Sequence, residues 1–153
     1  MMENPETQIA QYLEPFDDKI VSLAQALRHF LLSETKPKYE LVGDSTISVN
    51  IGYGFTQKSW DCYCAIIVYS MHINISFPAG ASLPDPQGIL QGAGKKIRHM
   101  KVKDTSYLKV QEVREILDEA RSRALARAEL SSKNFTTETI IKPIAGIKKR
   151  PCN

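Results

Sequence analysis

Cysteine is scarce in this chain, and long apolar runs are missing from it. Only three of its 153 residues are cysteine, namely Cys62, Cys64 and Cys152, and this odd number predicts no disulfide framework. No run approaches the ~18 apolar residues that a membrane-spanning helix requires. Residues 1–19 are polar and acidic and lack the basic and then apolar pattern of a signal peptide. These absences predict a cytoplasmic protein with reduced thiols and no membrane partner.

Charge of the two signs is unevenly spread along the chain. The first 94 residues hold 5 Lys or Arg and 10 Asp or Glu, a net −5, whereas residues 95–153 hold 15 and 7, a net +8. A basic second part is one sign of contact with nucleic acid. It is equally compatible with two parts that neutralise each other within the fold or across a dimer. Tyr107 is isolated and forms no stacking array with other aromatic residues, so nucleic acid is not an expected partner.

Apolar residues at three- and four-residue steps predict two long amphipathic helices, over residues 17–34 and 110–130. A shorter helix is expected over 5–13. One or two helical turns are expected over 86–91, because Asp85 is a suitable cap and is followed by proline.

Alternating or continuous apolar residues predict the strands. Residues 45–55 alternate, which places on one face Ile47, Val49, Ile51, Tyr53 and Phe55. A central strand over 61–71 and an alternating strand over 72–80 follow. Residues 95–103 return to extended structure, and residues 137–142 precede a proline, which suits an edge strand.

This order of elements predicts a fold of the α+β class. We expect a two-layer arrangement, with an antiparallel sheet of about five strands and helices packed on one face. The length fits a single domain over residues 1–153. Within it, residues 131–153 are expected to form a basic C-terminal extension or an edge strand.

The segment ILQGAGKKIRHMKV, residues 89–102, has the glycines and lysines of a phosphate loop but not their spacing. The pattern G-x-x-x-x-G-K-[ST], counted back from Gly94, requires glycine where Ile89 stands, and Ser or Thr where Lys96 stands. Ile97 occupies the third glycine position of a dinucleotide fingerprint. Both nucleotide motifs are therefore excluded.

A less specific anion site remains, because glycines expose backbone amides and cations stand beside them. The residues predicted to bind a small anionic ligand are Gly92, Gly94, Lys95, Lys96, Arg98 and His99. The competing interpretation is that the glycines only supply turn geometry and the cations are solvated. Arg98 shares a strand face with Met100 and Val102, and it needs a carboxylate if that face is buried. The expected partner is Asp85 or Asp44.

Two cysteines lie two residues apart and, in a strand, would point the same way. Cys62 and Cys64 could begin a metal site together with His72 or His99. Such a pair in an apolar strand is more typical of two small buried hydrophobic side chains.

Three carboxylates, Glu14, Asp17 and Asp18, could coordinate a hard cation, but the favoured explanation is a solvated, capped helix start. The chain has no nucleophile elbow of the form G-x-S-x-G. The sequence therefore predicts no catalytic residues, no metal-ligating residues and no cofactor, and the protein is not expected to be an enzyme.

One long run, HINISFPAGASLPDPQGILQGAGKKIRHMKVKD, resembles the signature of the YdhG-like domain, a family of small bacterial proteins of unknown function. KYELVGDSTISVNIGYG resembles the family's first strand region, REILDEARSRA its last long helix, and KKRP its basic end. The likeness covers residues 12–153 and is most specific from Leu83 to His99. It implies a compact α+β fold and no established catalytic activity. Some members are labelled frataxin-like iron chaperones.

Two functional hypotheses follow. The first is a non-enzymatic binding domain for a small anionic ligand or a protein partner. Its groove would lie between the 80–99 loop and the sheet face that bears Asn50, Gly52 and Gly54. The alternative is frataxin-like iron binding or iron delivery, with the iron held by surface carboxylates such as Asp17 and Asp18.

Overall fold

Helices form the first layer of the computed structural model, which describes residues 4–130 and 135–143. The three helices are α1 (Pro5–Leu13), α2 (Asp18–Thr35) and α3 (Gln111–Ala128). Three short 3-10 helices lie between strands or before α3, namely η1 (Ser59–Asp61), η2 (Gly80–Ser82) and η3 (Thr105–Lys109). Among the described residues, no helix is both long enough and apolar enough to cross a membrane.

The second layer is one six-stranded sheet, with the order β5-β4-β3-β2-β1-β6. Its strands are β1 (Tyr39–Asp44), β2 (Val49–Gly54), β3 (Cys64–Val68), β4 (Ile73–Phe77), β5 (Arg98–Val102) and β6 (Glu138–Pro143). Neighbouring strands are antiparallel except for β1 and β6, which run parallel. The α+β class and the packing of helices on one side are therefore confirmed, with six strands instead of about five.

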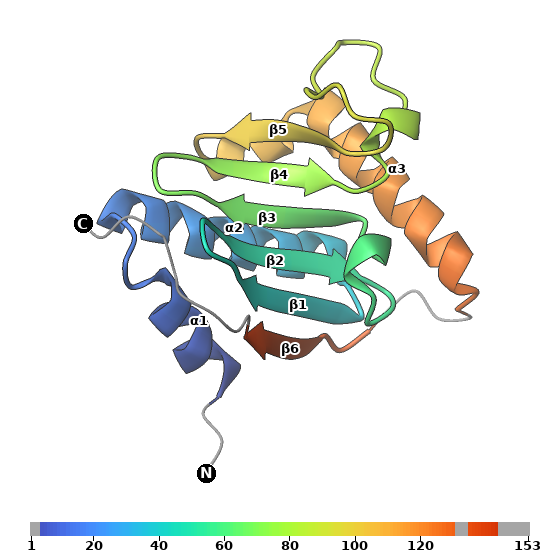
Figure 1. Cartoon of the computed structure of the whole chain (residues 1–153). Coiled ribbons are helices and arrows are strands. Elements are labelled where there is room, and N and C mark those ends of the chain that lie inside the picture. Colours follow the sequence, from blue (N-terminus) through green and yellow to red (C-terminus); the bar gives the residue numbers. More distant parts are fainter. Residues whose placement is uncertain (1–3, 131–134, 144–153) are drawn as a thin grey trace.

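Both long helices lie on the same side of the sheet. Figure 1 shows α2 and α3 behind the strands, while neither of them lies over the face toward the viewer. Because successive side chains in a strand point to opposite faces, every strand contributes alternately to the covered face and to this open face. We call the uncovered side the open face of the sheet.

Apolar side chains fill the space between the helices and the covered face. The fully buried ones include Leu27, Leu31, Ile51, Ile66, Ile73, Ile75, Phe77, Met100 and Leu108. Burying a side chain of this kind stabilises the fold by ~1.5–3 kcal/mol. Phe55 is buried as expected, whereas Ile47 is 59% exposed in the turn before β2, so its expected inward position is wrong.

The ends of α2 are held by polar contacts. At its start the Asp17 side chain accepts the N–H of Lys19 at 3.3 Å, which makes Asp17 a helix cap. At its end Lys36 has a φ of 46°, the left-handed conformation that stops a helix. Arg121 of α3 donates to the carbonyl oxygens of Thr35 and Lys36, so the two long helices are joined at this end.

An ionic cluster is buried beneath α2, among otherwise apolar side chains. The Glu40 side chain on β1 is 0% exposed, and its two oxygens accept hydrogen bonds from Arg28 at 2.8 and 2.9 Å. The same guanidinium donates to Glu6 of α1 at 2.6 Å. Tyr53 of β2 and Thr139 of β6 also donate to Glu40, at 2.9 and 2.7 Å. The cluster thereby connects α1, α2, β1, β2 and β6.

The contacts within the cluster shift the pKa values of Arg28, Tyr53 and Glu6. Burial disfavours the charged form of Arg28, but the hydrogen bonds to Glu40 and Glu6 outweigh burial and raise its pKa above the usual value. Burial, followed by the neighbouring Glu40 charge, raises the pKa of Tyr53 well above its ordinary value, so its hydroxyl stays a donor. The hydrogen bond from Arg28 lowers the pKa of Glu6.

The cluster also explains why the pattern of apolar residues in the sequence does not predict strand β1. The alternation in YELVGD puts Glu40, Val42 and Asp44 on the covered face, where apolar residues are expected. Two charged residues at inward positions disguise the strand, and the sheet therefore has one strand more than expected.

The prediction of one or two helical turns over residues 86–91 is also wrong. The described chain turns at Pro86 and Gln87 without forming a helix. The Asp85 carboxylate instead accepts the N–H groups of Ile89 and Leu90, both at 2.8 Å. One side chain thus holds the turn that was expected to be helical.

Substituting Arg28 by Met should lower the free energy of unfolding by about 3–5 kcal/mol, because Glu40 is then a buried charge without its cation. The double variant Arg28→Met with Glu40→Gln should recover much of the loss, since glutamine is neutral and still accepts from Tyr53. Urea unfolding of the wild type and the two variants measures both effects. A double variant no more stable than Arg28→Met would contradict the proposed role of the charge.

Glu6→Gln tests the exposed end of the cluster by its pH dependence. Because the pKa of Glu6 in the folded protein lies below its usual 4.5, the ion pair with Arg28 stabilises the fold fully above that pH. The stabilisation is lost as the pH falls from 4.5 through the folded pKa. The stability difference between wild type and Glu6→Gln should therefore be constant from pH 8 to about 5 and shrink below 4.5.

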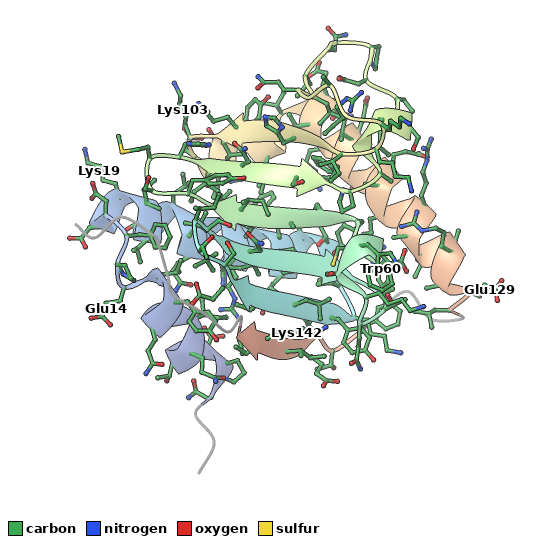
Figure 2. All side chains as sticks on the ribbon, viewed as in Figure 1. Glu14, Lys19, Trp60, Lys103, Glu129 and Lys142 are labelled. Carbon is green, nitrogen blue, oxygen red and sulfur yellow. The ribbon has the colours of Figure 1, made fainter. Side chains whose placement is uncertain are left out.

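The matched control is Glu14→Gln. Glu14 is exposed and points away from the fold in Figure 2, and it belongs to no ion pair among the described residues. Its stability difference from the wild type should not shrink in the same way. Equal pH profiles for the two variants would show that the Arg28 contact contributes nothing.

Candidate functional site

The predicted anion-binding residues lie in two places. Gly92, Gly94, Lys95 and Lys96 belong to the long loop between η2 and β5, whereas Arg98 and His99 belong to β5 itself. The loop folds back on the strand, because the backbones of Gln91 and His99 exchange hydrogen bonds of 2.8 and 2.9 Å.

Arg98 organises this loop. Its Nη1 donates to the carbonyl oxygens of Gly94 and Ile97, at 2.5 and 2.8 Å. Glycines make room for it, since a Cβ at Gly80 would come within 2.6 Å of the Arg98 Cβ, and Gly92 has a φ of +129° and lies beside the Arg98 Cδ. Arg98 and the glycine at 92 therefore have a structural role here.

The prediction that Arg98 pairs with the carboxylate of Asp85 or Asp44 is wrong. The Asp85 carboxylate is directed at backbone N–H groups of its own turn. Asp44 lies on β1, and three strands separate β1 from β5. At ~4.8 Å per strand this distance is far beyond the reach of an arginine. The carbonyl oxygens of its own loop satisfy Arg98 instead.

Lys95 and Lys96 line a hollow that we call the loop cavity, of about 360 Å³. Its walls are Trp60, Asp61, Pro78, Ala79, Ala81, Ser82, Lys95, Lys96 and Arg127. Arg127 of α3 pairs with Asp61 of η1, with 3.1 Å between Nε and Oδ1. Three cations thus face one carboxylate, and the loop cavity carries a positive charge.

Trp60 is a candidate functional residue that the sequence analysis did not single out. It is 75% exposed on η1, although indole is among the largest apolar side chains. Figure 2 places it at the end of the sheet near α3. Tryptophan is enriched at binding interfaces, because its ring offers a large apolar surface and its N–H a polar contact. The signal was available in the sequence, since the only tryptophan lies in the polar loop FTQKSW.

A second hollow, which we call the sheet groove, lies on the open face and measures about 390 Å³. It is lined by Leu41, Val42, Gly43, Asn50, Gly52, Ser59, Cys62, Ala65, Ile67, Ser76, Pro78 and Lys142. This lining is mostly apolar, and none of its described residues is Asp or Glu. Pro78 lines both hollows, so the sheet groove and the loop cavity adjoin.

The single groove expected between the 80–99 loop and the sheet is therefore two separate hollows in the structure. Asn50 and Gly52 do line a groove on the open face. Gly54 does not line it, because Cys62 covers that position, with its Cα only 3.1 Å from where a Cβ would stand. Residues of the 80–99 loop line the loop cavity and not the sheet groove.

Two glycines form part of the groove floor for different reasons. A Cβ at Gly52 would lie 2.8 Å from the Cys62 Sγ, so close packing requires glycine there. A Cβ at Gly43 would meet only the Lys142 carbonyl oxygen, at 4.0 Å. Gly43 is not among the described glycines with positive φ either. Neither backbone nor packing requires glycine at position 43, and its missing side chain keeps the groove open.

Cys62 and Cys64 do not point the same way. Cys64 is part of the core under the helices, whereas Cys62 lies against Gly52 on the open face. Burial raises the pKa of the Cys62 thiol to about 12 and raises that of Cys64 as well. Both therefore remain protonated thiols at neutral pH, which is the unreactive form.

The structure shows no cluster of carboxylates for the alternative hypothesis, iron binding, within its described residues. Asp17 is engaged as the cap of α2. Within residues 4–130 and 135–143, no group of three or more His, Cys, Asp or Glu side chains is placed to hold a metal ion.

The two floor glycines give a matched test of these packing arguments. Gly43→Ala should raise the free energy of unfolding by about 0.5–1 kcal/mol, because alanine restricts the unfolded chain and meets open space in the strand. Gly52→Ala should lower it by about 1–3 kcal/mol, because the new methyl overlaps the Cys62 sulfur. Urea unfolding midpoints compare them. Equal losses in both variants would show that the space above Gly43 is not open.

Comparison with known proteins identifies no protein similar to this chain. No protein-family model, no curated protein and no solved structure matches this chain. The likeness to the YdhG-like family therefore stays a prediction from the sequence motifs, and the function must be argued from the site alone.

Proposed function

We propose that the protein is a non-enzymatic binding domain that holds a small anionic ligand in the loop cavity. The observation that carries the proposal is the meeting of Lys95, Lys96 and Arg127 in one hollow beside the exposed Trp60. These cations come from two distant parts of the chain, the loop before β5 and the end of α3.

The chemistry of the lining favours an anion with a flat or apolar part. Lysine ammonium groups and an arginine guanidinium donate charge-assisted hydrogen bonds, the strong kind, to phosphate or carboxylate oxygens. Trp60 offers an indole face against which a ring can stack. An acidic segment of a protein partner presents the same carboxylates and is the second reading of this site.

Several observations support binding without catalysis. Burial keeps the thiols of Cys62 and Cys64 protonated, so neither is a ready nucleophile. The free, buried state of both thiols also fits the reducing cytoplasm in which we place the protein. We keep the resemblance to the YdhG-like family as part of the proposal, because of the Leu83–His99 motif.

Iron delivery is the less favoured function, because the Asp17 carboxylate serves as a helix cap.

Trp60 makes the proposal directly measurable. Because it is the only tryptophan, its fluorescence should change when pyrophosphate, citrate or ATP is titrated into the protein and the loop cavity fills. Lys95→Ala with Lys96→Ala should weaken the binding at least about tenfold, since each charge-assisted hydrogen bond contributes ~1.5–3 kcal/mol.

The matched control is Lys19→Ala with Lys103→Ala, which removes the same charge. Both lysines are exposed and lie far from Trp60 in Figure 2. This variant should bind like the wild type at physiological salt, where distant charges are screened. If both double variants lose affinity equally, only net charge matters and the loop cavity is not the site. If the wild type responds to none of the three anions, the proposal fails.

A further inference from the structure

We propose that the sheet groove is a second binding site, which takes an apolar carboxylic acid with its chain across β1, β2 and β3 and its carboxylate on Lys142. The site is separate from the anion site in the loop cavity, and either can exist without the other.

The shape of the groove follows from the register of the strands. On the open face Gly43 lies directly between Lys142 of β6 and Asn50 of β2, and Ile67 of β3 continues this row. A parallel row runs from Leu41 through Gly52 and Ala65 to Ser76. The missing side chains of Gly43 and Gly52 and the small ones of Ala65 and Ser76 leave a trough across the strands. The larger side chains of Leu41 and Ile67 stand beside it.

The apolar floor points to an apolar ligand body. A volume of about 390 Å³ lies within the usual range for small-molecule pockets, ~300–1,000 Å³. Leu41, Ala65 and Ile67 supply the apolar walls, on a face that neither α2 nor α3 covers (Figure 1). Gly43 keeps the trough open although neither packing nor backbone requires glycine there.

Charge at one end of the groove selects the head group. Among the described residues of the lining, Lys142 is the only charged one, and Figure 2 shows it on β6 at the edge of the sheet. Its Nζ donates one hydrogen bond to the Gln57 carbonyl oxygen, at 3.2 Å. An ammonium has three N–H donors, so two remain for a carboxylate. Because the lining residues that the structure describes include a lysine and neither Asp nor Glu, the groove favours an acid over an amine.

The test uses octanoate and 1-octanol as probes in calorimetric titrations of the full chain. The wild type should bind both, with octanoate the tighter. Lys142→Met, which keeps the length of the side chain and removes its charge, should weaken octanoate about tenfold or more and leave octanol unchanged. Lys142→Arg should retain the preference for the acid.

Variants that fill the groove with a larger side chain give a second, independent test. Gly43→Phe should abolish binding of both probes, and Gly43→Val should weaken it, while both variants unfold cooperatively in urea. The matched control Lys101→Met removes an exposed lysine from the open face at β5, outside the groove, and should bind octanoate like the wild type. Lys95→Ala with Lys96→Ala should also bind octanoate normally, which separates this site from the loop cavity.

Three outcomes would overturn the proposal. The first is a wild type that binds neither probe, and the second is a folded Gly43→Phe variant that binds octanoate as before. The third is a wild type that is dimeric by light scattering, becomes monomeric through Gly43→Phe and binds no probe, because the groove is then an interface between two copies of the chain.

Discussion

The carboxylate of Glu40 is the constraint on which the arrangement of the sheet depends. A buried charge is tolerated only when it is paired and hydrogen-bonded, and Arg28 supplies both oxygens with donors. This fixes the register of β1, because a shift by one residue would turn Glu40 to the open face and place Leu41 and Gly43 under the helices. The ionic cluster under one face thus determines which side chains form the groove on the other.

Core and groove therefore alternate along the same strands. On β3, Ile66 and Val68 pack beneath the helices, whereas Ala65 and Ile67 line the sheet groove. Stability depends mainly on the covered face, where the large side chains are buried. The open face contributes little to the core, so its residues are free to be small, as at Gly43. Binding and folding can consequently be altered separately in this protein.

Periodicity alone predicts the parts of the fold that bury apolar side chains, namely the long helices and strands β2 to β4. It fails at β1, because two acidic residues, Glu40 and Asp44, occupy inward positions. Glu40 is acceptable there because the fold brings Arg28 to it. The candidate site was predicted only in part for a similar reason. The lysines of the glycine-rich loop do line a cavity, but the roles of Arg98, Trp60 and Lys142 depend on neighbours that the fold brings together.

The uneven charge of the chain also finds a partial explanation in the fold. Two ion pairs join the acidic first part to the basic second part, Arg127 to Asp61 at 3.1 Å and Arg114 to Glu34 at 3.8 Å. Such exposed pairs contribute only ~0–1 kcal/mol each, so they neutralise charge more than they stabilise. Within the described residues, the lysines of the loop cavity and Lys142 have no ion pair. Part of the charge that these pairs leave over therefore borders the two hollows, where an anion can balance it.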